Sequence, residues 1–127
     1  MPDSTDAREW VRYATSDLLI AETPPPSGVL LEHLCFHAQQ ATEKALKAVL
    51  VARGVVPPKT HDIAALVEQV AQNGTVLPGE LMPITELTAF AVLSRYSADF
   101  GELDDDEWAR NVALARAAVE WAAGVVG

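Results

Sequence analysis

Residues 30–53, LLEHLCFHAQQATEKALKAVLVAR, are the stretch of this sequence that decides the fold. Their apolar side chains recur at steps of three and four, which places them on one face of an α-helix. These side chains are Leu30, Leu31, Leu34, Cys35, Ala38, Ala41, Ala45, Leu46, Val49 and Leu50. Arg53 and Gly54 then supply a cation near the negative end of the helix and a residue that tolerates a left-handed cap. The pattern predicts a long helix with one buried face.

A second, polar stripe runs beside the apolar one. Its members also follow four- and three-residue steps: His33, His37, Gln40, Lys44 and Lys47. Imidazoles, an amide and ammonium groups in one line could face an anion. The same pattern suits the solvated flank of an amphipathic helix, which spacing alone favours, and the ligand face stays open as the alternative.

Length, charge and cysteine content limit the class of protein. The 127 residues fit one domain, residues 1–127, that is large enough to bury a core. Asp and Glu outnumber Lys and Arg 18 to 9, so the chain lacks the global basic surface that duplex nucleic acid requires; a basic partner or a small ligand fits better. The single cysteine excludes an internal disulfide. Without a signal-peptide pattern or a membrane-spanning apolar run, we expect a cytoplasmic protein with no membrane contact.

Helical periodicity continues on both sides of the central stretch, and proline-containing loops separate the segments. We expect one helix to start between Asp3 and Asp6 and to end near Glu22, and a last one from Asp104 to about Val125. Asp6 with Glu9, and Asp104 with Glu107, have the spacing of a capping box. Asp17, in the first of these helices, is expected to be a solvated carboxylate.

Two further helices are predicted between residues 60 and 95. A short one has Thr60 as its N-cap and ends at residues 73–74, and His61 at its entry is expected to hydrogen-bond the loop rather than a ligand. The other spans 81–95, with Phe90 and Leu93 outside its main apolar face and in need of a cover. The fold class is therefore all-α, an antiparallel four-helix up-and-down bundle with a short additional helix.

Several kinds of chemistry have no motif in this chain. There is no glycine-rich phosphate loop and no nucleophile elbow of a Ser–His–Asp hydrolase. His33 and His37 have metal-binding spacing without a third ligand nearby, and the acids at 104–107 are explained by the start of a helix. We expect no metal and no cofactor.

One segment resembles a known family. Residues 36–48, FHAQQATEKALKA, followed by Pro57-Pro58 and by Thr60-His61-Asp62, are similar to the HEPN family, which is named for domains in higher eukaryotes and prokaryotes that bind nucleotides. The similarity extends to Trp10, Tyr13, Ala14, Asp17 and Leu18, to Arg95-Tyr96 and to residues 118–121. It implies the HEPN bundle, commonly a homodimer, in a prokaryotic toxin-antitoxin pair with a minimal nucleotidyltransferase.

The resemblance also bears on activity. Many relatives are metal-independent ribonucleases that use an Arg, four to six intervening residues and a His, paired across the dimer. Here Arg95 is followed at 100–102 by Phe, Gly and Glu, and seven residues separate Arg53 from His61. The usual ribonuclease motif is therefore missing, and we expect no catalytic residues.

The expected function is that of a nucleotide- or RNA-binding subunit and partner of a minimal nucleotidyltransferase. Its ligand-binding residues are expected to be His37, Gln40, Lys44, Lys47, Arg95 and Tyr96. Two alternatives stay open: a ribonuclease toxin with a non-standard active site, and a non-catalytic scaffold that docks a partner chain on Phe90 and Leu93.

Overall fold

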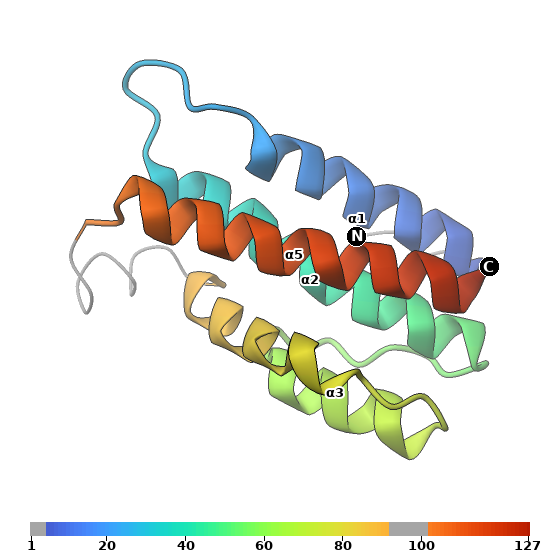
Figure 1. Cartoon of the computed structure of the whole chain (residues 1–127). Helices are drawn as coiled ribbons and strands as arrows, with labels where there is room; N and C mark the ends of the chain where they lie inside the picture. Colours follow the sequence, from blue (N-terminus) through green and yellow to red (C-terminus); the bar gives the residue numbers. More distant parts are fainter. Residues whose placement is uncertain (1–4, 92–101) are drawn as a thin grey trace.

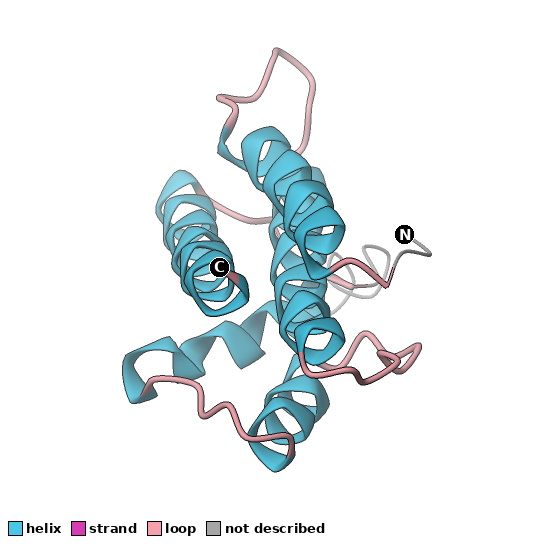
Figure 2. Cartoon of the chain, turned by 90° about the vertical axis from the view of Figure 1, so that its right-hand side faces the viewer, coloured by secondary structure: helices cyan, strands magenta, loops and turns pink. Residues whose placement is uncertain are grey.

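Five helices make up the described part of the chain, residues 5–91 and 102–127 of a computed structural model (Figure 1). They are α1 (Ala7–Glu22), α2 (Leu31–Ala52), α3 (Ile63–Gln72), the 3₁₀ helix η1 (Gly79–Phe90) and α5 (Asp105–Val126). α1 and α2 run antiparallel with α5 beside both, and α3 and η1 pack below them (Figures 1 and 2). The predicted all-α bundle is confirmed.

The core lies along α2, as the sequence pattern predicts. Its apolar face is buried from Leu34 to Leu50, and α1, α5, α3 and η1 all pack against it. Leu30, expected on this face, precedes the helix and is 54% exposed. Removing one large aliphatic side chain from water contributes about 1.5–3 kcal/mol, so this face supplies much of the stability. Gly54 follows the helix with φ of 77°, the left-handed conformation expected there.

The two predicted N-caps of the long outer helices are present. The Asp6 carboxylate accepts a hydrogen bond from the Arg8 amide at 3.0 Å, and the Asp104 carboxylate accepts one from the Glu107 amide at 2.8 Å. Each satisfies a donor that the first turn of a helix leaves free. The acids at 104–107 thus open α5.

The predicted N-cap of α3 was wrong by two residues. Asp62, not Thr60, is the cap, since its carboxylate accepts from the amides of Ala64 and Ala65. The Thr60 hydroxyl instead accepts from the Asp62 amide at 3.1 Å and positions the cap. When two capping residue types stand this close together, spacing alone does not choose between them.

The segment predicted as an α-helix from 81 to 95 differs in its described part. Residues Gly79–Phe90 form a 3₁₀ helix, and its buried side chains fall at every third position: Leu81, Ile84, Leu87 and Phe90. A 3₁₀ helix has three residues per turn, so this row lies on one face. Phe90 is only 4% exposed, which corrects the expectation that it points away from the core. Leu93 and the continuation to Arg95 lie outside the described residues.

Polar contacts fix α5 against α1. The Trp108 indole donates to the Ala21 carbonyl at 2.9 Å, and the Arg116 guanidinium contacts the Glu22 carboxylate with two nitrogens. The bond from Arg116 lowers the pKa of Glu22 below its usual range despite an opposing effect of burial. These contacts hold α1 in place, which matters because α1 carries part of the polar site.

Candidate functional site: two carboxylate-centred clusters on α2

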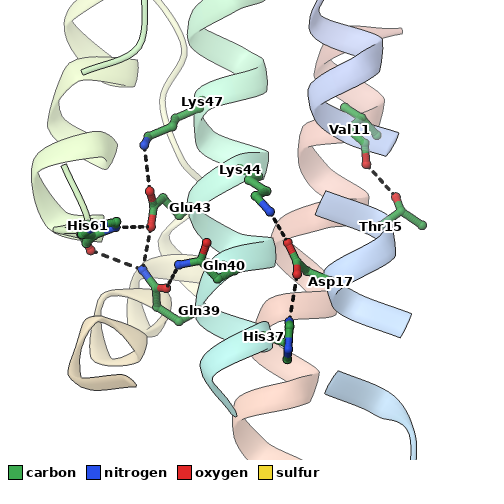
Figure 3. A network of polar contacts seen from close by, with 10 residues as sticks. All are labelled: Val11, Thr15, Asp17, His37, Gln39, Gln40, Glu43, Lys44, Lys47 and His61. Carbon is green, nitrogen blue, oxygen red and sulfur yellow. Dashed lines mark hydrogen bonds and ion pairs between the residues drawn. The ribbon is translucent and has the colours of Figure 1, made fainter. Parts of the chain in front are cut away.

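A buried carboxylate joins α1 to α2. Asp17 is 8% exposed, and its two oxygens bind side chains of α2: Oδ1 lies 2.9 Å from Nδ1 of His37 and Oδ2 lies 2.5 Å from Nζ of Lys44 (Figure 3). His37 and Lys44 are seven residues apart, two turns of a helix, so one carboxylate placed between them reaches both. Both hydrogen bonds have the carboxylate as acceptor and are therefore charge-assisted.

An aromatic ring extends this group along α1. Tyr13 lies one turn before Asp17, and its ring centroid is 6.0 Å from the Lys44 ammonium and 5.1 Å from the guanidinium carbon of Arg12. We call Tyr13, Asp17, His37 and Lys44 the seam cluster, because they lie between α1 and α2. The two rings are the accessible part, since Tyr13 is 36% exposed and one third of the His37 side chain is exposed, against about one tenth for Asp17 and Lys44.

A second carboxylate, Glu43, lies on the side of α2 that faces α3. It has no exposed surface and accepts hydrogen bonds from Gln39 at 2.9 Å, Lys47 at 2.7 Å and His61 at 3.0 Å (Figure 3). We call these four residues the inner cluster. Burial raises the pKa of Glu43, but the three hydrogen bonds outweigh it and leave the pKa below its ordinary value.

The two clusters share one design. In each, a buried carboxylate binds a histidine through Nδ1 and a lysine through Nζ. Gln40 sits between them and donates to Gln39 at 2.8 Å (Figure 3). Gln39, Gln40, Glu43 and Lys47 of α2 thus order one another, and Asp17 of α1 orders His37 and Lys44.

The predicted ligand-binding residues are distributed over these clusters. His37, Gln40 and Lys44 lie at or beside the seam, whereas Lys47 is buried and its ammonium is bound to Glu43. Arg95 and Tyr96 lie outside the described residues. The solvated-flank interpretation is wrong for Lys44 and Lys47, because their side chains are 11% and 3% exposed; His33, at the start of the stripe, is exposed.

Sequence reasoning missed both central carboxylates. Asp17 was expected to be solvated, yet it lies between Ala14, Leu18 and Ala21 on the buried side of α1. An acid at a position that helical spacing assigns to the core was the available signal. His61 was expected to bind the loop, whereas its imidazole binds Glu43 and its carbonyl accepts from Gln39 at 3.4 Å.

The described residues offer no further reactive or metal-binding site. The buried Cys35 thiol accepts from Asn111 at 3.6 Å, and burial raises its pKa to about 11, so it is a poor nucleophile. In residues 5–91 and 102–127, no group of three or more His, Cys, Asp or Glu side chains could hold a metal ion. No helix in the same ranges is long and apolar enough to span a membrane.

These features define the class: an all-helical bundle whose central helix carries two ordered carboxylate–histidine–lysine clusters. The profile of the HEPN domain matches residues 7–125, nearly the whole chain, and the chain belongs to the HEPN family. Members of this family are generally linked to RNA or to toxin-antitoxin pairs and often dimerise. Comparison with curated proteins and with solved structures gave no match.

Proposed function

We propose that this HEPN protein is a nucleotide- or RNA-binding subunit that works with a minimal nucleotidyltransferase in a toxin-antitoxin-type module. The observation that carries the proposal is the seam cluster. It places an accessible, ordered imidazole beside an ammonium group and an aromatic ring on an otherwise acidic protein. Such a combination suits a nucleotide, which offers hydroxyls, phosphates and a flat base in a small volume.

The ligand site in this proposal is built around the exposed end of the seam. His37, Gln40 and Lys44 would contact the ligand directly, with Arg95 and Tyr96 completing the site. Lys47 would support the site without touching the ligand. Its bond to Glu43 stabilises the inner cluster, which orders Gln39 and, through it, Gln40.

A homodimer is part of the proposal, and the outer side of α1 is the surface that best suits it. A shallow groove there is lined by Arg12, Thr15, Ser16, Leu19, Ile20 and Thr23. Leu19 and Ile20 are 57% and 44% exposed, and Arg12 is the one charged residue of the six. Two identical acidic chains repel each other, so a second copy is best accommodated on a surface with little charge.

The dimer would also bear on the ligand site. Arg12 lines the groove and lies over the Tyr13 ring of the seam cluster. A second copy seated on α1 would therefore border the seam. The burial of Phe90 weakens the scaffold alternative, because Phe90 is one of the two residues on which that alternative would dock a partner chain.

The ribonuclease alternative has one observation in its favour. Asp17 holds His37 through Nδ1 and leaves Nε2 free to take a proton, the arrangement that general bases use. Histidine can supply acid-base catalysis in this way without a metal. A non-standard centre would need Arg95 close to His37.

One experiment separates these functions. The purified protein is titrated with fluorescent mononucleotides and short single-stranded RNA, and the same RNA is analysed for cleavage in the presence of a chelator. Saturable binding that Lys44→Ala and Arg95→Ala weaken, with intact RNA, is the expected result. Chelator-resistant cleavage lost in His37→Ala would instead favour the ribonuclease, and no binding at all would contradict the proposal.

The partner is tested separately. Where a minimal nucleotidyltransferase is encoded beside this chain, coexpression should yield a stable complex that elutes as one species in size-exclusion chromatography. Any growth defect caused by expressing this chain alone should become smaller when the nucleotidyltransferase is expressed with it. Two proteins that elute apart and do not alter each other's effect on growth would contradict the partnership.

A further inference from the structure

The hydrogen bonds of Asp17 determine which nitrogen of His37 carries the proton. A carboxylate accepts hydrogen bonds and donates none, so the 2.9 Å contact from Oδ1 requires the proton on Nδ1. In the neutral imidazole, Nε2 then has a free lone pair and acts as an acceptor. Nε2 lies across the ring from Asp17 (Figure 3).

The neutral imidazole is compatible with the charges around it. Lys44 contacts Oδ2 of Asp17 at 2.5 Å, so one ammonium already balances the one carboxylate. Asp17 does not need a second positive charge on His37 to be satisfied. In this neutral form, the accessible nitrogen of the seam is an acceptor.

An acceptor at this position selects among the groups of a nucleotide. Phosphate oxygens are acceptors themselves, so they are repelled by the lone pair of Nε2 and find a better partner in a cation. A ribose hydroxyl donates and fits it. The 2′-hydroxyl is also the group that distinguishes RNA from DNA.

We propose that His37 Nε2 accepts a hydrogen bond from the ribose 2′-hydroxyl of a bound RNA, with Asp17 as the positioning residue that fixes the imidazole tautomer. This inference rests on the proposed function and adds the contact by which the site would distinguish RNA from DNA. Tyr13 and Lys44 flank the same seam and supply ring and cation contacts to the rest of the nucleotide.

Replacing Asp17 by Asn should change Nε2 of His37 from an acceptor to a donor without removing the site. Lys44 can only donate, so the amide oxygen of the new side chain turns toward Lys44 and its NH₂ group toward Nδ1 of His37. Nδ1 then becomes the acceptor, and the proton moves to Nε2. Loss of a negative charge should at the same time strengthen attraction to phosphate.

The test measures binding of one short single-stranded sequence in three forms: RNA, DNA and 2′-fluoro RNA, whose fluorine accepts weakly and cannot donate. Assays run by fluorescence anisotropy at about pH 8, where histidine is mostly neutral. The parent protein should prefer RNA to both analogues about three- to tenfold, the worth of one hydrogen bond. His37→Phe should lose this preference. Asp17→Asn, whose Nε2–H can still donate to the hydroxyl oxygen and weakly to fluorine, should prefer RNA to 2′-fluoro RNA less than the parent does, and it should bind at least as tightly as the parent.

His61→Phe is the matched control, because His61 is held by a carboxylate in the same way but belongs to the inner cluster. It should keep the preference for RNA. Thermal unfolding of each variant identifies any that fail to fold, and His37→Phe tests the idea independently of Asp17→Asn.

The outcomes separate the two proposals. If the parent binds RNA and its analogues equally, or if His37→Phe keeps the preference, this inference is overturned while the binding function stands. If the parent binds none of the three, this inference is overturned, and the binding function is overturned with it when mononucleotides do not bind either.

Discussion

At the scale of single residues, Glu43 is the side chain whose loss should destabilise the fold most, because it accepts the hydrogen bonds of the inner cluster. It has no exposed surface, and the Lys47 side chain bound to it is 3% exposed. We predict that Glu43→Ala lowers the free energy of unfolding by about 3–5 kcal/mol, because it leaves a buried ammonium without its partner. Urea unfolding followed by circular dichroism measures the change.

The control for this prediction removes both charges. Glu43→Leu combined with Lys47→Met keeps the volumes and leaves no buried charge, so stability should return to near the parent value or exceed it. A double variant as unstable as Glu43→Ala would show that packing, not charge, explains the loss.

Protonation of Glu43 in acid should lower the stability of the protein. The folded-state pKa of Glu43 is lowered from its ordinary value of 4.5, so its contribution is complete above that pH and is lost as the pH falls through the folded-state pKa. We predict that the stability of the parent falls below pH 4.5 more steeply than that of the Glu43→Leu, Lys47→Met variant. Parallel curves for the two proteins would contradict the assigned ion network.

At the scale of elements, η1 makes the sharpest prediction. Phe90 is the last of the four buried side chains, spaced three residues apart, by which η1 packs on α2, so Phe90→Ala should cost about 3–5 kcal/mol. Met82, in the same helix and 46% exposed, is the control, and Met82→Ala should change stability by less than about 0.5 kcal/mol. Similar small losses of stability in both variants would contradict the buried position of Phe90 and favour the α-helical face first expected for this segment.

The cap of α3 provides a second test at this scale. Asp62→Ala should destabilise the protein by about 0.5–2 kcal/mol, the usual cost of losing an N-cap. Thr60→Ala removes only the bond that positions Asp62 and should cost less. The reverse order would mean that Thr60 is the true cap.

These elements also show how far sequence reasoning reaches. The extent of α2 followed from its periodicity because nearly all of its apolar face is buried by four neighbours. η1 did not, since Leu81, Ile84 and Leu87 fit both a three-residue row and an α-helical face, and only packing chooses between them. The seam cluster could be predicted only in part. Helical spacing placed His37 and Lys44 on one side of α2, but their partner Asp17 lies on another helix, 20 positions before His37, so spacing within one helix could not pair them.

At the scale of the whole molecule, the weakly charged outer side of α1 and the acidity of the chain lead to one prediction about assembly. If two copies pack through this surface, a charge placed on each copy near the symmetry axis is duplicated across the interface and repels. Leu19→Glu should therefore convert the dimer to a monomer in sedimentation analysis, with circular dichroism unchanged because Leu19 is exposed in the single chain. Val76→Glu, which adds the same charge at a side chain 78% exposed in the loop between α3 and η1, should remain dimeric.

A parent that sediments as a monomer, or a Leu19→Glu variant that still dimerises, would contradict the proposal that a second copy binds the α1 groove. Because the groove shares Arg12 with the surroundings of Tyr13, the monomeric variant should also bind RNA more weakly, which connects the oligomeric state to the seam.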